Sequence, residues 1–339
     1  MRRAVLLAIL FVAVAGPASA EPTVLQTGTS PVININLRSG SITIKTWNRN
    51  AVQVDAGAGV NAQHLDANVV AGRIPRQMPA WSQSVKTPRG DAILSAEVWI
   101  LPRLATVSHD AVVVRGDGDA TLTVPSGAAF ISARAIGRGS ISLDGYRDGA
   151  FFLSARVGGI DLHDVSGTGF VQTVRGPIDA TASSFERLRA RNAIGLIFFS
   201  DCAARQIEVT SVFGSVIYDN GTFVPGLARF ESQNGDVALG ISGDAQIGAH
   251  SATGTVQTEF TGRAEVQGSG GDARASIGSG GAAVTASSGS GMILLYDGSL
   301  RDHANLVRRV PRIRSVFAKH PKTGWPARAR RSARPPYRV

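Results

Sequence analysis

The sequence is poor in the residue types that build disulfide frameworks, metal sites and large aromatic cores. Cysteine occurs once in 339 residues, as Cys202, which excludes an intramolecular disulfide framework. The six histidines never approach the spacing of zinc ligands, and no set of cysteines accompanies them. Aromatic residues make up only 6% of the chain, which suits tight turns around a narrow core. Packing of small side chains must therefore hold the fold, and Cys202 is expected to be an apolar filler near a turn.

Long hydrophobic runs are also scarce. The one that stands out lies at the N-terminus. Arg2 and Arg3 precede an apolar run over residues 4–15, and an Ala-Ser-Ala segment ends at Ala20. These features are typical of a signal peptide over residues 1–20, with Glu21 as the first mature residue. We therefore expect an exported protein, in the periplasm, at the cell surface or secreted, with no transmembrane span after cleavage. An uncleaved anchor is the alternative.

Familiar catalytic motifs are missing as well. The sequence has no Gly-x-Ser-x-Gly nucleophile elbow. It also lacks the carboxylate motifs expected of a β-helix enzyme that cleaves polysaccharides. These absences argue against the common hydrolases, and the sequence predicts neither a cofactor nor a metal ion.

What the chain has instead is one short phrase that returns between residues 139 and 258. The phrase is a glycine, one further residue that is mostly small or polar, and then an apolar, a variable and usually another apolar residue. Successive glycines lie 19, 18, 19, 19, 21 and 19 residues apart. Such a period is typical of stacked coils, whereas a β-sandwich has no reason to hold it. The glycines that begin the phrases are Gly139, Gly158, Gly176, Gly195, Gly214, Gly235 and Gly254.

The alternation within each phrase predicts a short strand with one face toward the core. Its first and third residues should point inward, as in Ile160 and Leu162, and the residue between them outward. The outward column should hold Ser142, Asp161, Asp179, Phe198, Ile217, Ala238 and Gln257. A second strand should precede most glycines, with inward pairs Phe151/Leu153, Leu188/Ala190, Ile207/Val209, Ala228/Phe230, Ile247/Ala249 and Ala264/Val266. The predicted fold is all-β: a β-solenoid over residues 126–300, with about 19 residues per coil.

The N-terminal part, residues 21–125, is expected to be a β region that caps the first coil and protects its open edge. Strands are predicted at residues 32–37, 41–46 and 52–54, and again at 92–100, 111–115 and 121–124. Residues 62–89 break the pattern with three prolines and are expected to form an excursion.

Several of these segments resemble a known bacterial family. Gly-Ser-Ile-Thr-Ile-Lys-Thr-Trp47 with Val52-Gln-Val54, and Leu122-Thr-Val-Pro125 with the Gly-x-Ile-x-Leu coils that follow, are similar to the adhesin-like β-strand-repeat proteins. Their domain has no assigned function, and the similarity covers about residues 30–295. The resemblance implies a secreted or envelope-attached β-solenoid with no catalytic residues to carry over. The excursion at residues 62–89 departs from the usual compact N-terminal part of that family.

The C-terminal end changes character. Residues 268–291 contain eight glycines, which predicts a thin final coil that frays, with a last strand at residues 291–296. Residues 301–339 carry 12 Lys and Arg but one acid, and their prolines favour a disordered basic tail. Such a tail would attract anionic lipid or acidic glycan rather than nucleic acid, or it is a solvated appendage. The arginines concerned are Arg308, Arg309, Arg312, Arg314, Arg328, Arg330, Arg331 and Arg334.

Two outward pairs are candidate sites. Asp161 and Asp179 occupy the same position on adjacent coils, so their Cα atoms should lie about 5 Å apart. Such a pair could supply the acid and base of a glycosidase or a weak calcium site, but ordinary surface aspartates are the simpler interpretation. Phe198 and Ile217 follow in the same column. They would form an apolar patch that the excursion, the tail or a second chain covers.

The sequence thus favours a non-catalytic exported β-solenoid of the cell envelope that serves as a scaffold or adhesin-like interaction surface. Its partner would be another envelope protein, a glycan or an anionic membrane surface. Two alternatives stay open. One is an atypical carbohydrate-active β-helix enzyme, and the other is an envelope-stress or anionic-membrane-binding protein that acts through its basic tail.

Overall fold

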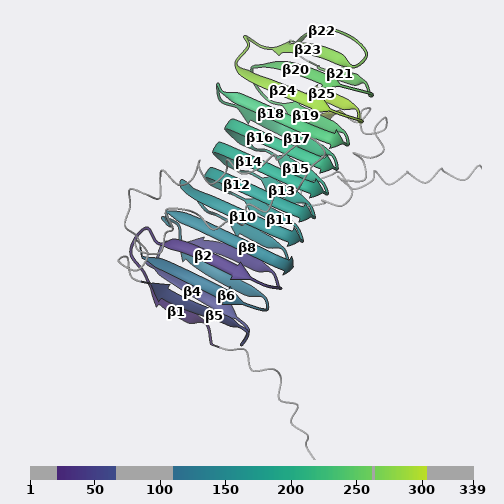
Figure 1. Cartoon of the computed structure of the whole chain (residues 1–339). Coiled ribbons are helices and arrows are strands. Elements are labelled where there is room, and N and C mark those ends of the chain that lie inside the picture. Colours follow the sequence, from purple (N-terminus) through teal and green to yellow (C-terminus); the bar gives the residue numbers. More distant parts are fainter. Residues whose placement is uncertain (1–20, 66–109, 262–263, 304–339) are drawn as a thin grey trace, which may run out of the picture.

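A computed structural model describes residues 21–65, 110–261 and 264–303, and within them the chain is almost entirely β (Figure 1). Besides 25 strands, these ranges contain only the 3₁₀ turn η1, Leu300–Asp302. The prediction of an all-β fold is confirmed. The predicted signal peptide, residues 66–89 of the excursion, the predicted strand at 92–100 and the tail from residue 304 onward lie outside the described residues.

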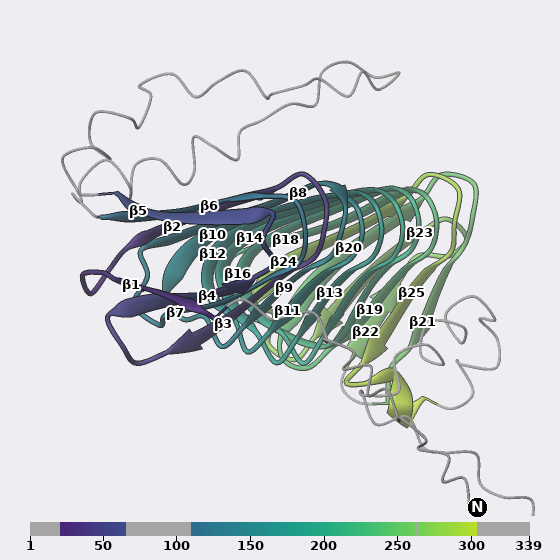
Figure 2. The ribbon, with the colours of Figure 1, turned by 90° about the horizontal axis from the view of Figure 1, so that it is seen from below.

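The strands form two sheets that face each other across the core (Figure 2). In order along the stack, sheet A contains β1 (Thr23–Gln26), β4 (Ala51–Ala56), β7 (Ala120–Pro125), β3 (Ile42–Trp47), β9 (Ile141–Asp144), β11 (Ile160–His163), β13 (Ile178–Thr181), β15 (Ile197–Ser200), β17 (Val216–Phe223), β19 (Val237–Ile241), β25 (Ile293–Asp297) and β21 (Val256–Glu259). Sheet B contains β5 (Val60–Leu65), β6 (Ala111–Gly116), β2 (Val32–Leu37), β8 (Phe130–Arg138), β10 (Gly149–Val157), β12 (Ser166–Arg175), β14 (Ser184–Ile194), β16 (Ala203–Phe213), β18 (Leu227–Asn234), β24 (Ala282–Ser288), β20 (Ala245–Ser251), β23 (Asp272–Ile277) and β22 (Ala264–Gln267).

Through the middle of the stack, equivalent residues of successive phrases pair in parallel. Ile160 is opposite Ile178, and Ile178 is opposite Ile197, as the sequence predicts. The predicted inward residues of these strands are buried. The same holds for the second strand of each coil as far as Ile247 and Ala249. The prediction is wrong for Val266, which is 41% exposed because β22 is an edge strand with β23 as its partner.

The glycine that begins each phrase sits where two coils touch backbone to backbone. Gly195 has a φ of 146°, and a Cβ added to it would lie 2.2 Å from the carbonyl oxygen of Gly176. A Cβ on Gly176 would lie 2.1 Å from the carbonyl oxygen of Gly158. A side chain at any of these corners would push neighbouring coils apart, so the corner requires glycine.

A column of buried polar side chains lies beside these corners on the inner face of sheet B. Thr173 donates a hydrogen bond to the carbonyl oxygen of Gly158 at 3.1 Å. Ser232 and Ser288 donate in the same way to Gly214 and Gly235, at 2.8 and 2.9 Å. Each hydroxyl satisfies a buried carbonyl of an adjacent coil, which explains why polar residues interrupt the apolar column.

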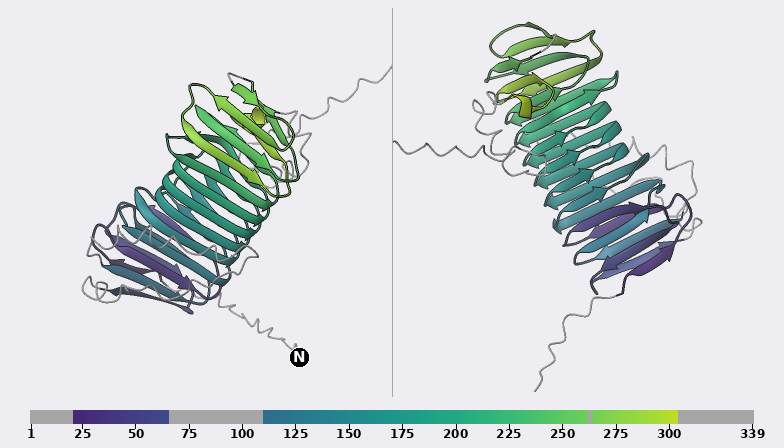
Figure 3. Two further views of the ribbon diagram at one scale, coloured as in Figure 1. Left: turned by 45° about the horizontal axis from the view of Figure 1, so that its top comes forward. Right: turned by 180° about the vertical axis from the view of Figure 1, so that it is seen from behind.

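The stack is not wound in simple chain order, because both ends are interleaved. β2 lies between β6 and β8, and β3 lies between β7 and β9. At the other end, β24 and β25 lie between β18/β19 and β20/β21 (Figures 1 and 3). The predicted last strand is therefore not at the end of the stack, since β24 and β25 have strand neighbours on both sides.

Antiparallel strands close the two ends. β4 and β5 pair antiparallel with β7 and β6, and β23 pairs antiparallel with β20. The predicted excursion begins too early, because Ala62 to Leu65 belong to β5. The outward column also ends differently: Ala238 is opposite Leu294, and Gln257 lies one strand further on.

Candidate functional site

The predicted carboxylate pair is brought together. Asp161 of β11 is directly opposite Asp179 of β13 on the outer face of sheet A. Asp161 is exposed and Asp179 is half-buried. Burial, with the charge of Asp161 as a second cause, raises the pKa of Asp179 to about 7. The Asp179 carboxyl group can therefore hold a proton near neutral pH, as a general acid must.

The predicted apolar patch is not on the surface. Phe198 and Ile217 are 1% and 0% exposed, and they pack in a buried cluster with Leu294, Tyr296 and Leu300. These three residues come from the C-terminal part of the described chain, far away in sequence. Phe198 and Ile217 are therefore not an accessible partner surface. Their cover comes from within the chain, but from residues 294–300, which belong neither to the predicted excursion nor to the predicted tail.

Asp219 anchors the C-terminal segment that contributes to this cluster. Its carboxylate, in β17, accepts hydrogen bonds from the Tyr296 hydroxyl at 2.9 Å and from the Leu300 backbone N–H at 2.7 Å. Ser299 donates a third bond at 3.1 Å. Burial raises the pKa of Asp219, and these donors partly offset that effect. No local sequence pattern reveals this anchor, because its partners lie 77 to 81 residues further along the chain.

An exposed ridge runs along the glycine corner, where the strands of sheet B end. The residues just before successive corner glycines are opposite one another: Arg138 and Val157, Val157 and Arg175, Arg175 and Ile194, Ile194 and Phe213. One residue before this row on each strand, Arg156 is opposite Val174, because the residues on either side of them are paired in register. We call this set, together with Ile136, the corner ridge. Its members are Ile136, Arg138, Arg156, Val157, Val174, Arg175, Ile194 and Phe213.

The corner ridge combines apolar exposure with positive charge. Its five apolar side chains are between 36% and 56% exposed. Arg138, Arg156 and Arg175 are also exposed, and none of them forms an ion pair with another described residue. The two strand positions that form the ridge carry no Asp or Glu on β8, β10, β12, β14 and β16. The repeat phrase could have revealed the ridge, since its members stand just before the phrase begins.

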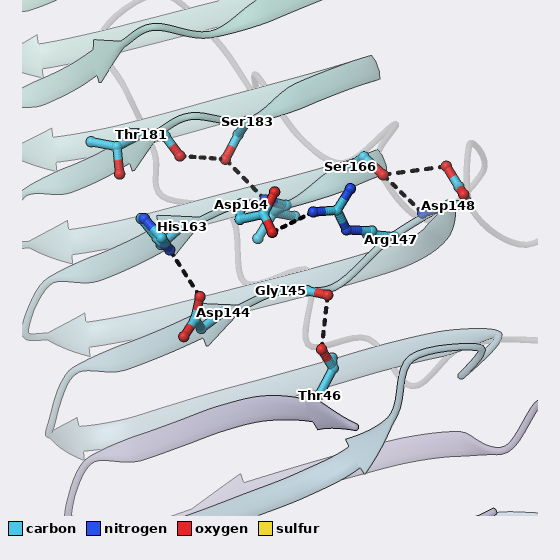
Figure 4. A network of polar contacts seen from close by, with 11 residues as sticks. Thr46, Asp144, Gly145, Arg147, Asp148, His163, Asp164, Ser166, Thr181 and Ser183 are labelled. Carbon is cyan, nitrogen blue, oxygen red and sulfur yellow. Dashed lines mark hydrogen bonds and ion pairs between the residues drawn. The ribbon is translucent and has the colours of Figure 1, made fainter. Parts of the chain in front are cut away.

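At the opposite corner, where the strands of sheet A end, the charged side chains lie beside partners of opposite sign (Figure 4). Arg147 forms an ion pair with Asp164, and His163 Nδ1 lies 2.9 Å from Asp144 Oδ1. Asp164 also has a φ of 51°, in the left-handed region that Asp and Asn tolerate better than most residues. This corner satisfies its own polar groups and leaves little for a partner.

Other predicted groups give no chemistry in the part of the chain that the structure describes. Those residues contain no group of three or more His, Cys, Asp or Glu side chains placed to hold a metal ion. Cys202 is buried beside a turn, and burial raises its pKa to about 12, so the thiol is unreactive. None of the described helices has the length and apolarity to cross a bilayer. The eight tail arginines lie outside the described residues.

Comparison with known proteins adds little. No protein-family model matches the chain, and no curated protein matches it. One similar solved structure is that of a Clostridium sporogenes protein provisionally described as a cell adhesion protein. The likeness covers 82% of this chain and 98% of that chain, with 8% identity and a TM-score of 0.21. A TM-score this low has no bearing on the fold or function of this chain.

Proposed function

We propose that this protein is an exported, non-catalytic β-solenoid of the cell envelope that serves as an adhesin-like interaction surface. The corner ridge is the observation that carries the proposal. It places five exposed apolar side chains and three arginines along one edge of a rigid stack. A row of exposed side chains along one edge can lie against an extended surface.

The partner that fits this ridge best is an anionic membrane surface. Arginine binds lipid phosphates through its planar fork, and valine, isoleucine and phenylalanine side chains bury themselves at the boundary between headgroups and acyl chains. Residues 21–300, taken together, do not attract anions in bulk. Residues 21–300 contain 21 Lys and Arg against 24 Asp and Glu, so the positive charge of the ridge is local.

Binding of the full chain to vesicles tests this role. We compare vesicles with 30% phosphatidylglycerol against pure phosphatidylcholine, in a salt series. Each arginine near an anionic surface contributes about 1 kcal/mol. The double substitution Arg156→Gln with Arg175→Gln should therefore weaken binding roughly 10- to 30-fold. Phe213→Ser should weaken it further, because an apolar contact is lost.

The controls separate the ridge from the tail. The matched double substitution Arg147→Gln with Arg205→Gln removes two exposed arginines outside the ridge and should leave vesicle binding unchanged. Deleting residues 304–339 tests the tail. If the deletion abolishes binding while the ridge substitutions do nothing, the tail is the membrane-binding element and the ridge is not.

The carbohydrate-active enzyme is the second candidate, and the Asp161–Asp179 pair favours it. Two carboxyl groups lie opposite each other on adjacent strands, and one of them has a pKa near 7, as the general acid of a glycosidase requires. Turnover of acidic polysaccharides that disappears in the Asp179→Asn protein would establish this alternative. The interaction role expects no turnover in either protein.

A further inference from the structure

At Gly248, no neighbouring atom prevents a larger residue from taking the place of glycine. Gly248 lies in the middle of β20 on the outer face of sheet B, and a Cβ added to it would meet no heavy atom within 4 Å. At every other glycine within the described strands, an added Cβ would come closer than 3 Å to a neighbour. At Gly169 the neighbour is the Phe151 ring, at 2.1 Å, and at Gly240 it is the Tyr296 ring, at 2.3 Å.

This open space has an energetic consequence. Glycine inside a strand is less stable than alanine by about 0.5–1 kcal/mol, because it loses more backbone freedom on folding. The other strand glycines offset that loss by admitting a neighbouring ring or backbone, and Gly248 does not. A glycine of this kind marks a place where a ligand can approach the backbone closely.

Gly248 lies in a groove of about 690 Å³. One row of residues crosses it from strand to strand: Arg229 of β18 is opposite Thr285 of β24, which is opposite Gly248, which is opposite Arg274 of β23. The small residues Thr285 and Gly248 therefore form a low floor between two arginines. The Cα atoms of these arginines are separated by three strand spacings, or about 14 Å.

A second row in the same groove has a different chemistry. Ser287, His250 and Asp272 line the groove in this row, and Glu231, which is opposite Ser287, lies just outside the lining. His250 Nδ1 lies 2.7 Å from Asp272 Oδ1. One side of the groove thus offers guanidinium groups, and the other side offers hydroxyl, imidazole and carboxylate groups.

The charges on the first row are not equally engaged. Arg229 Nη2 lies 3.1 Å from Glu231 Oε2, so its charge is partly balanced. Arg274 forms no ion pair with any described residue. The groove therefore has an available cation at its β23 wall.

We infer that this groove binds a carboxylate-bearing saccharide, such as one or two linked uronic acid units. The carboxylate would accept charge-assisted hydrogen bonds from Arg274 and Arg229, which are the strong kind. The sugar hydroxyls would donate to Asp272 and exchange hydrogen bonds with Ser287. A sugar ring lies flat over Gly248 because no side chain stands there. A volume of about 690 Å³ is within the range of ligand sites.

This inference deepens the proposed interaction role by naming a ligand class, but it is independent of the corner ridge. Titration calorimetry on the full chain tests it with two probes, oligogalacturonate and its fully methyl-esterified form. The free acid should bind at least tenfold more tightly than the ester. Arg274→Gln should weaken binding of the acid at least tenfold.

Gly248→Val is the decisive variant. It fills the floor of the groove with a residue that suits a strand, so binding should fall more than tenfold while the melting temperature stays the same or rises. Ala283→Val adds similar bulk on the same exposed face of β24, outside the groove lining, and should change neither quantity. If Gly248→Val does not fold, Arg274→Gln decides the question.

Three results would overturn the inference: no binding of the acid by the wild-type chain, equal binding of acid and ester, or unchanged binding in a folded Gly248→Val protein. The ridge variant with Arg156→Gln and Arg175→Gln should bind oligogalacturonate normally. Failure of the vesicle experiment therefore leaves the groove untouched, and failure of the groove leaves the ridge untouched.

Discussion

At the scale of single residues, the raised pKa of Asp179 makes the free energy of unfolding depend on pH. Burial raises its pKa from 3.8 to about 7, so the folded state holds the proton more tightly than the unfolded chain does. The resulting stabilisation is complete below pH 4, falls as the pH rises through the interval from 4 to 7, and is lost above pH 7. Three pKa units correspond to at most about 4 kcal/mol, and partial exposure to solvent reduces this.

Asp179→Asn should therefore stabilise the protein at pH 8 and have little effect at pH 4. We expect the free energy of unfolding to rise by roughly 1–3 kcal/mol at pH 8, seen as a melting temperature a few degrees higher. Asp161→Asn removes only the second cause of the raised pKa, so its effect should be smaller and in the same direction. An equal gain at both pH values would show that the Asp179 proton is not responsible.

At the scale of the coil, the corner glycines set the spacing between neighbouring strands. Gly195→Ala forces a methyl group to within 2.2 Å of the Gly176 carbonyl oxygen, at a φ that alanine avoids. We expect a loss of about 3 kcal/mol or more in the free energy of unfolding, measured by chemical denaturation. Gly248→Ala is the matched control, because the same methyl group enters open space and should stabilise by about 0.5–1 kcal/mol. Similar losses in both variants would rule out corner contact as the cause.

The contrast between these glycines shows what the sequence could and could not predict. The repeated phrase encodes strand positions and register locally, so the alignment of Ile160, Ile178 and Ile197 follows from it. The phrase cannot distinguish Gly195 from Gly248, because the difference lies in which atoms the neighbouring strand brings close. The charged groove at Gly248 could not be predicted, since its lining comes from five strands, β18, β20, β22, β23 and β24, whose order in the sheet differs from their order in the chain.

The burial of Phe198 and Ile217 could not be predicted from the sequence for a related reason. Their alternation correctly placed them on the outer face, beside Asp179. Only long-range packing covers that face, through Leu300 and the anchor at Asp219. The corner ridge differs, because its residues stand at a fixed place in the repeat and could have been predicted from the sequence.

At the scale of the whole molecule, the interleaved ends determine which parts of the stack are firmly held. Regular repeats supply many strands of similar pattern, so the pattern alone cannot decide whether β24 and β25 lie at the tip or inside. In the structure, β25 has a hydrogen-bonded neighbour on each side, β19 and β21, whereas β21 pairs with β25 alone among the described strands. The order of strands at the ends therefore depends on pairing between distant segments.

Hydrogen exchange can test this arrangement directly. Amide protons of Leu294 and Leu295 should exchange as slowly as those of β17 and β19, because opening β25 separates two pairs of strands. Amides of the edge strands β21 and β22 should exchange much faster. If β25 instead exchanges as fast as β21, residues 282–297 form a loose terminal coil in solution.

Truncation extends the same reasoning to the folded state as a whole. A chain that ends at His303 keeps β25, Leu300 and their contacts with Asp219, so its melting temperature should match that of the full chain. A chain that ends at residue 281 loses β24 and β25. This loss separates β18 and β19 from β20 and β21, and it uncovers Phe198 and Ile217. Several large apolar side chains then lose their cover, at about 1.5–3 kcal/mol each. We therefore expect this shorter chain to aggregate or unfold, and a stable monomer with an unchanged melting temperature would refute the interleaved end.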